Sequence, residues 1–248
     1  MLPSISQLLP KITKQKIQLD TLRPFDQTQL KNLRERFRIG FIHHSNAIEG
    51  NTLTLQEVKM VIEEWITIGG KTLIELQETI NHGKLMDQIH DMFEQNGFHF
   101  TPKEICQLHK FLTEGIVKTK ESGHRRTISI RVSWSEDSFP LPQDLTSLMD
   151  NYCKKRTRKK YSLEQIAHIH YDFVKIHPFV DGNGRIARVL MNLALVSWGY
   201  FPIIISKSVR KKYIESLQGN NFDQRYQCFL WQLHENNKDY LRFLSNNN

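Results

Sequence analysis

Apolar residues recur with a helical period along most of the chain. After Pro24 and Asp26 they follow the spacing of an amphipathic helix, at Leu30, Leu33, Phe37, Phe41 and Ile48. This pattern predicts one long helix over about residues 26–50. Further helix starts are indicated where Thr or Ser stands three residues before Glu or Gln, which is the capping-box pattern. The pairs are Thr54 with Glu57, Thr72 with Glu75, Thr101 with Glu104, and Ser162 with Gln165.

One segment follows a different period. Between His124 and Trp134 apolar residues alternate with polar ones, at Ile128, Ile130 and Val132. Alternation of this kind indicates a β-strand. A short β-ribbon is not stable alone and must lie against the rest of the protein. The predicted fold class is therefore mainly α, with a single β-hairpin over about residues 124–134.

Two apolar helices are predicted on either side of a polar loop. Residues 163–177 carry apolar side chains along one face of a helix, and residues 186–196 are apolar almost all round. A helix that is apolar on every side is buried. A further helix is expected to start at Ser206 or Ser208, and a last packing helix contains Phe229 and Phe243.

The composition is that of a soluble globular protein. The chain has 248 residues, of which 39% are hydrophobic, and no apolar run reaches the length of a membrane span. The first residues lack the charged start and apolar stretch of a secretory signal. The three cysteines are scattered and follow no zinc or disulfide pattern. We expect one compact cytoplasmic unit without membrane contact.

The net charge of +8 favours anionic partners such as nucleotides. Part of this excess lies in one run, Lys154 to Lys160, with six basic residues in seven. Such a run can follow a nucleic-acid backbone. No aromatic residues interleave with it to stack on bases, so a solvated surface is favoured and nucleic acid is disfavoured as a partner.

The densest chemistry lies at residues 177–188, which read HPFVDGNGRIAR. Gly182 and Gly184 allow a sharp turn and bring backbone N–H groups close to an anion at the start of the next helix. Arg185 and Arg188 share a face of that helix and suit two successive phosphates. The segment therefore predicts a polyphosphate site.

Two more residues of this segment suit chemistry on a polyphosphate. His177 can take up a proton near neutral pH, as a general base must. Asp181 offers hard carboxylate oxygens for Mg²⁺, which normally shares a protein carboxylate with substrate phosphates. Binding and cleavage of a Mg²⁺-bound polyphosphate are the predicted chemistry.

The segment resembles the signature of the Fic (Fido) family, HxFx(D/E)GNGRxxR. The matching positions are His177, Phe179, Asp181, Gly182, Asn183, Gly184, Arg185 and Arg188. A second stretch resembles the inhibitory motif of class II Fic proteins, (S/T)xxxE(G/N), at Ser45, Glu49 and Gly50. The resemblance implies an autoinhibited class II Fic protein.

The same resemblance implies the organisation of the chain. A helical region over residues 1–100 would carry the inhibitory helix, a Fic core over 101–205 the flap and the loop, and helices over 206–248 would complete the Fic-type helical domain. The predicted hairpin corresponds to the flap, which aligns a target peptide by main-chain pairing. The flap residues would be Thr127, Ile128, Ser129 and Ile130. Asn221 is similar in place to a family asparagine that contacts adenine, and the adjacent Asn220 fits as well.

The reaction that the resemblance implies is protein adenylylation, in which AMP passes from Mg²⁺-bound ATP to a Ser, Thr or Tyr hydroxyl of a protein. His177 would be the base and Asp181 would hold Mg²⁺. Asn183 and the loop N–H groups would bind the α-phosphate, and Arg185 the β-phosphate. Pyrophosphate would leave.

Glu49 would act as an inhibitor within the chain. Arg188 would bind the γ-phosphate of ATP, and pairing with the Glu49 carboxylate would occupy that guanidinium. ATP would then bind out of line for transfer.

The sequence leaves other functions open. Glu49 would orient a water if the enzyme removes AMP from a modified protein, and transfer of UMP or phosphocholine fits the same residues. A Doc-like kinase is disfavoured because the loop keeps both glycines of GNGR. A non-catalytic nucleotide-binding regulatory module would not need the base at His177. The target protein, modification of the chain by itself and formation of a homodimer are also left open.

Overall fold

The computed structural model describes residues 2–95, 99–131, 139–156, 161–218 and 221–245. All regular secondary structure within these ranges is helical. The α-helices are α1 (Ile5–Thr21), α2 (Gln27–Ile48), α3 (Leu55–Glu63), α4 (Leu73–Gln95), α5 (Pro102–Thr113), α6 (Leu145–Lys154), α7 (Leu163–Ile176), α8 (Asn183–Ser197), α9 (Arg210–Leu217) and α10 (Phe222–Ser245). Two short 3₁₀ helices, η1 (Pro142–Asp144) and η2 (Lys207–Val209), precede α6 and α9.

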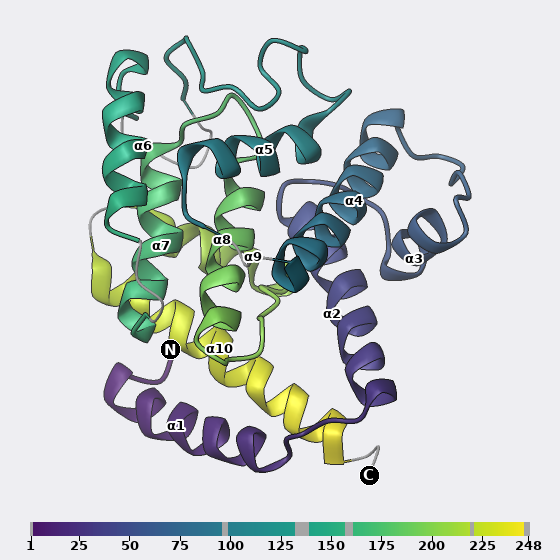
Figure 1. Ribbon diagram of the computed structural model, residues 1–248, viewed down its shortest axis with the longest axis vertical. Helices are drawn as coiled ribbons and strands as arrows, with labels where there is room; N and C mark the ends of the chain where they lie inside the picture. Colours follow the sequence, from purple (N-terminus) through teal and green to yellow (C-terminus); the bar gives the residue numbers. More distant parts are fainter. Residues whose placement is uncertain (1, 96–98, 132–138, 157–160, 219–220, 246–248) are drawn as a thin grey trace.

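Helix α8 lies at the centre of the molecule and packs along α7 (Figure 1). Almost every side chain of α8 from Asn183 to Leu195 is buried, as its all-round apolar sequence predicts. Helices α1 and α10 lie side by side across the lower edge of the view, and α10 contacts α7. Helices α2, α3 and α4 gather on one flank, where Ile42, Leu53 and Val58 belong to a separate apolar cluster. No helix in the described ranges combines the length and apolar character needed to cross a lipid bilayer.

The predicted helix over residues 26–50 is confirmed as α2. The Asp26 side chain accepts a hydrogen bond from the backbone N–H of Gln29, and the Asp26 N–H donates to the Gln29 side-chain oxygen, so a capping box starts the helix. Helix α2 ends at Ile48, and Gly50 follows with a left-handed φ of 111° that a glycine adopts without strain. This end places Ser45 in the last turn and Glu49 directly after it.

The four predicted helix starts are also present. In each case the Thr or Ser side chain accepts a hydrogen bond from the backbone N–H three residues later, at 3.2 Å. These bonds satisfy donors that a helix leaves unpaired at its start. The middle of the chain is therefore divided where its sequence indicates.

Helix α1 was not predicted from the sequence. Ser4 and Gln7 form a capping box at its start, and Leu8, Ile12, Gln15 and Leu19 are buried along one face. Their spacing is that of an amphipathic helix, so the signal was present in the sequence. Helix α1 packs on α10 and completes the lower layer.

The β-hairpin expected over residues 124–134 is not seen. Residues 124–131 contain no strand, and residues 132–134 lie outside the described part of the chain. A strand needs a partner for its backbone groups, but the N–H of Arg126 donates to the carbonyl of Pro178 instead, at 2.9 Å. Ile128, expected on an apolar face, is 57% exposed. The segment is thus an irregular stretch bonded to the loop after α7.

Burial of α8 gives a direct test of what supports the site. Leu190 is fully buried in α8, so Leu190→Ala should lower the free energy of unfolding by about 3 kcal/mol, because it removes packed methyl groups and leaves a cavity. Val196 is on the same helix but 39% exposed, so Val196→Ala should change stability by less than about 1 kcal/mol. Urea denaturation measures both, and equal losses would contradict the central position of α8.

Candidate active site

The loop between α7 and α8 is shaped by two left-handed residues. His177 ends α7 with φ 49° and ψ 58°, and Pro178 follows, which cannot continue the helix. Gly182 starts α8 with φ 75°. A left-handed conformation costs a non-glycine residue about 1 kcal/mol, so the backbone strain falls on His177. The loop therefore turns sharply at both ends and presents the start of α8.

Asn183 fixes the loop from inside. Its buried side-chain oxygen accepts a hydrogen bond from the N–H of Phe179 at 3.0 Å, and its amide nitrogen donates to the carbonyl of Phe179 at 2.8 Å. We expected this amide beside an α-phosphate. In the structure it holds the loop closed, and it can assist a ligand through the backbone that it orders.

His109 of α5 supports the loop from outside and was not singled out from the sequence. Its ring stacks on Phe179, with centroids 3.7 Å apart and planes at 9°. Its Nδ1 accepts from the N–H of Gly123 at 2.9 Å, so Nε2 carries the proton and donates to the carbonyl of Asp181 at 3.0 Å. Burial lowers the pKa of His109 to about 4, which keeps the ring neutral. The only signal was a histidine among the apolar positions of a helix.

Arg126 ties the segment that precedes residue 132 to the same loop. Its buried guanidinium donates to the carbonyls of His177 at 2.9 Å, Ile128 at 2.9 Å and Pro140 at 2.7 Å. Its backbone N–H reaches Pro178. One arginine thus joins the loop to residues on both sides of positions 132–138, which lie outside the described ranges.

His177 is arranged to act through one ring nitrogen. Its Nδ1 lies 3.1 Å from the carbonyl of Val174 and donates to it, which leaves Nε2 as the acceptor. Burial lowers the pKa of His177 to about 4, and the positive charge of Arg126 also lowers it. The hydrogen bond to Val174 and the carboxylates of Glu49 and Asp181 act in the opposite direction but do not offset burial. At pH 7 the imidazole is neutral and can accept a proton.

Arg188 is the most fully bonded group of the site. It is buried, and it donates to the Glu49 carboxylate at 2.7 Å, to the Ser45 hydroxyl at 2.9 Å and to the Ser45 carbonyl at 2.9 Å. Its last contact is the Tyr213 hydroxyl at 3.4 Å. Burial opposes the charge, but the Glu49 carboxylate and Tyr213 raise the pKa of Arg188 above its usual value. The structure therefore brings together Ser45, Glu49 and Arg188, as their motifs predict.

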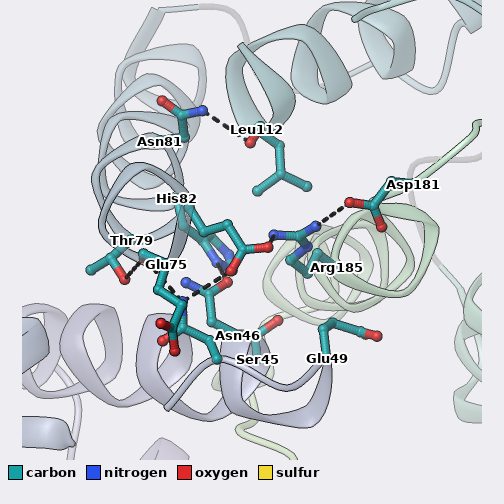
Figure 2. Close-up of polar contacts among 12 residues, drawn as sticks. Ser45, Asn46, Glu49, Glu75, Thr79, Asn81, His82, Leu112, Asp181 and Arg185 are labelled. Carbon is teal, nitrogen blue, oxygen red and sulfur yellow. Dashed lines mark hydrogen bonds and ion pairs between the residues drawn. The ribbon is translucent and has the colours of Figure 1, made fainter. Parts of the chain in front are cut away.

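The Glu49 carboxylate also lies against the first turn of α8. A Cβ atom on Gly184 would stand 2.4 Å from Glu49 Oε1, so only glycine allows this approach. Gly184 is helical, and of the two loop glycines Gly182 alone makes the turn. Helix N-termini attract anions through their free N–H groups and dipole. Ser45 and Glu49 stand at the end of α2 on the side that faces Arg185 (Figure 2), and the Glu49 carboxylate lies against the first turn of α8.

Arg185 is held between two carboxylates. One terminal nitrogen donates to Glu78 of α4 at 2.8 Å and the other to Asp181 at 3.0 Å, a contact drawn in Figure 2. Arg185 is buried, whereas the Asp181 side chain is 53% exposed. Glu78 was not singled out from the sequence, where it is one of many helical glutamates.

Asp181 is the residue that fits a cation. Its half-exposed carboxylate stands at the open side of the loop and offers hard oxygen atoms. The described residues contain no group of three or more His, Cys, Asp or Glu side chains placed to share a metal ion. Mg²⁺ suits such a position, because it takes one or two protein carboxylates and completes its shell with phosphate oxygens and water.

Other predicted residues lie apart from this cluster. Asn221 is exposed, and its side chain accepts from the N–H of Gln224 at 3.1 Å, where it caps α10. Its neighbour Asn220 lies outside the described residues. Of the expected flap residues, Thr127, Ile128 and Ser129 are exposed and Ile130 is half-buried.

The basic run from Lys154 is only partly described, because residues 157–160 fall outside the described ranges. Lys154 and Lys155 are exposed. Arg156 is buried and donates to Asp172 at 2.6 Å, so this charge serves packing between α6 and α7. That contact removes one of the six charges from any nucleic-acid surface.

Comparison with known proteins agrees with the signature. Residues 99–195 match the model of the Fic/DOC family. A protein adenylyltransferase Fic from Nematostella vectensis is 32% identical over 233 residues, which are 90% of this chain and 54% of the relative. One from Aedes aegypti is 34% identical over 196 residues, 77% of this chain and 39% of the relative. The chain thus spans about half or less of the length of these relatives.

Solved structures show the same fold. Fic-1 from C. elegans, covering its residues 134–508, superposes with a TM-score of 0.85 at 22% identity, over 98% of this chain and 73% of that one. A Fic-domain signalling protein from Bacteroides thetaiotaomicron gives a TM-score of 0.78 at 24% identity, over 92% of this chain and 95% of that one. The helical architecture is therefore that of Fic proteins.

The protonation of His177 can be tested by NMR. Long-range ¹H–¹⁵N spectra should show the Nδ1–H form at pH 7 and a titration midpoint near 4, and His177→Ala should remove and so identify this signal. Because the folded pKa lies below the ordinary 6.5, the histidine favours the folded state above pH 6.5 and this contribution is lost as pH falls towards 4. A midpoint at or above 6.5 would contradict the burial and bonding described.

Proposed function

Residues 99–195 of this chain are a domain of the Fic/DOC family, and we propose that it is a protein adenylyltransferase that its own Glu49 inhibits. The observation that carries the proposal is the contact of Glu49 with both Arg188 and Gly184. A carboxylate there takes the position in which a phosphate of ATP would meet a guanidinium and a helix N-terminus. The curated relatives named protein adenylyltransferase support the reaction.

His177 is the proposed general base. Its Nε2 takes the proton of a Ser, Thr or Tyr hydroxyl of the target as the oxygen attacks the α-phosphorus of ATP. The pKa of about 4 makes the free imidazole a weak base. A bound triphosphate places negative charge beside it, which raises that pKa toward the working pH.

The phosphates are bound by fixed positive groups. The first N–H groups of α8 receive the α-phosphate, Arg185 the β-phosphate and Arg188 the γ-phosphate. Mg²⁺ held by Asp181 would neutralise charge on the phosphates. Because these groups are positioned before ATP binds, most of the acceleration comes from orientation and electrostatics, with no covalent enzyme intermediate. Pyrophosphate leaves.

Glu49 acts as the inhibitor by occupying Arg188. The pair is partly buried, with 36% of the Glu49 side chain exposed and 2% of the Arg188 side chain. ATP must displace the carboxylate before its γ-phosphate reaches Arg188. Until then the triphosphate is bound with the α-phosphorus out of line with the attacking hydroxyl.

The partners of the reaction are ATP and a protein that carries the hydroxyl. Residues 127–129 are exposed and form no strand, and their proposed role is to align a target segment by main-chain pairing. The carbonyl of Ile128 is already bonded to Arg126, so it is not part of that pairing. The chain itself is one candidate target. Binding of adenine by Asn221, self-association as a homodimer and a cytoplasmic location stay predictions from the sequence.

A second function uses the same site in reverse. The Glu49 carboxylate lies close enough to His177 to affect its pKa. A carboxylate in that place can orient a water toward the phosphorus of an AMP-modified protein. His177 Nε2 would take the proton of this water as its oxygen bonds to phosphorus, and would give the proton to the target oxygen as the bond from phosphorus to that oxygen breaks, which releases AMP and the free hydroxyl. Glu49 would then be required for removal of AMP and inhibitory for its addition.

Incubation with Mg²⁺ and α-labelled ATP tests the proposed function. Wild type should label protein weakly. Glu49→Gly frees Arg188 and should raise labelling at least about tenfold, the scale of one charge-assisted hydrogen bond at a reacting site. Glu49→Gly with His177→Ala should lose the label, since the base is gone. Label is followed on the chain and on added lysate proteins.

The controls separate the alternatives. Asp239→Gly removes a carboxylate that is 62% exposed on α10 and should leave labelling unchanged. Label that persists in the double variant would overturn His177 as base. If no variant labels protein, but wild type strips AMP from a modified protein and Glu49→Gly does not, removal is the function. Silence in both assays would favour a non-catalytic nucleotide-binding module.

A further inference from the structure

Glu78 is a largely covered carboxylate of the site that the proposed mechanism does not use. It belongs to α4, outside the segment 99–195, and only 14% of its side chain is exposed. Its Oε1 accepts from a terminal nitrogen of Arg185 at 2.8 Å. Removing a carboxylate from water is unfavourable unless the group is paired and hydrogen-bonded, so Glu78 must be stabilised by its contacts.

The second oxygen of Glu78 is bonded as well. Its Oε2 accepts from the side-chain amide of Asn51 at 3.0 Å, and the same amide donates to the carbonyl of Glu75 at 3.0 Å. The Asn51 oxygen accepts from the N–H of Leu53. With both oxygens bonded, the carboxylate is a fixed anchor for Arg185.

The two carboxylates on Arg185 differ in what can displace them. Asp181 is half exposed at the open side of the loop and is the residue that fits a cation. When Asp181 turns to a cation, Arg185 loses that partner. Glu78 is only 14% exposed and both of its oxygens are bonded, so it keeps its contact with one terminal nitrogen of Arg185. The other terminal nitrogen is then free to meet a phosphate, and the Nε of Arg185 has no partner among the described residues.

We infer that Glu78 is a positioning residue that holds Arg185 in the orientation required by the β-phosphate of the nucleotide. The inference rests on the proposed function. A guanidinium is a rigid planar fork, so fixing one terminal nitrogen fixes the direction of the others. Glu78 therefore acts on the nucleotide through Arg185 and gives the site a preference for nucleotides that carry a β-phosphate.

The coupling to Asn51 gives this anchor a second consequence. Asn51 stands two residues after Glu49, separated from it only by Gly50. The segment that carries the inhibitory carboxylate and the anchor of Arg185 are thus joined by one hydrogen bond.

Binding of ADP and AMP distinguishes this role from a merely structural one. The measurement is isothermal titration calorimetry with Mg²⁺ in the Glu49→Gly chain, so that the inhibitory carboxylate does not compete. Glu78→Ala should weaken ADP about tenfold, the worth of one charge-assisted hydrogen bond, and leave AMP unchanged. Glu78→Gln keeps an oxygen acceptor for Arg185 and should recover much of the ADP affinity.

Two further variants tie the effect to Arg185. Asp87 is another carboxylate of α4, 57% exposed and paired with Arg38, and Asp87→Ala should alter neither affinity. In an Arg185→Ala background, Glu78→Ala should cause no additional loss of ADP affinity, because its effect passes through the missing guanidinium.

Several results would overturn the inference. Equal losses for ADP and AMP would show a general disturbance of the site, and unchanged ADP binding would show that Arg185 needs no anchor. Tighter ADP binding would show that Glu78 competes with the phosphate. If the Glu49→Gly chain binds neither nucleotide, the proposed function fails and this inference fails with it. If that chain binds both nucleotides and only the Glu78 result is negative, the inference alone fails.

Discussion

The ion pair between Glu49 and Arg188 is the interaction on which the arrangement of the site depends. It joins residues 139 positions apart, and it joins α2 to the centre of the molecule. A buried guanidinium without a partner would be costly, so the folded state requires a carboxylate or another acceptor at this place. Ser45 and Tyr213 provide acceptors but no negative charge of their own at neutral pH. The last turn of α2 is therefore held on α8 by electrostatics as well as by packing.

A second buried arginine, one turn earlier on α8, is also paired with a carboxylate. Arg185 and Arg188 each meet a carboxylate from a helix that precedes the matched segment 99–195: Glu78 from α4 and Glu49 from the end of α2. The N-terminal helices thus supply the negative charges that allow two arginines to be buried before any nucleotide is bound. At Arg188 a phosphate is the proposed competitor of Glu49, whereas at Arg185 the proposed role of Glu78 is to hold the guanidinium while a phosphate meets its other terminal nitrogen. The ion pair that is proposed to inhibit the site therefore also stabilises the buried Arg188.

The loop itself is shaped by neutral or backbone contacts, which a nucleotide does not compete for. Asn183 closes it from inside, the neutral ring of His109 stacks on Phe179, and Arg126 bonds three carbonyls on its outer side. These bonds leave the half-exposed Asp181 as the part of the loop most open to change. The site therefore combines a backbone held by its own bonds with charged side chains whose acidic partners can be exchanged for a phosphate. Donors held in place in this way need little rearrangement when a phosphate binds.

The sequence by itself determined the helices and the loop chemistry. Helical spacing and capping pairs located α2, α7 and α8, because both signals are local, and the spacing within residues 177–188 grouped His177 with its arginines. Only the tertiary structure decided what each charge meets. The roles of Glu78, His109 and Arg126 could not be predicted locally, because the site groups that they bond lie 107, 72 and 51 residues away. The expected hairpin is not seen because a strand also depends on distant partners. Alternation of apolar and polar residues favours a strand, but the tertiary structure determines which groups the backbone N–H groups of the segment bond.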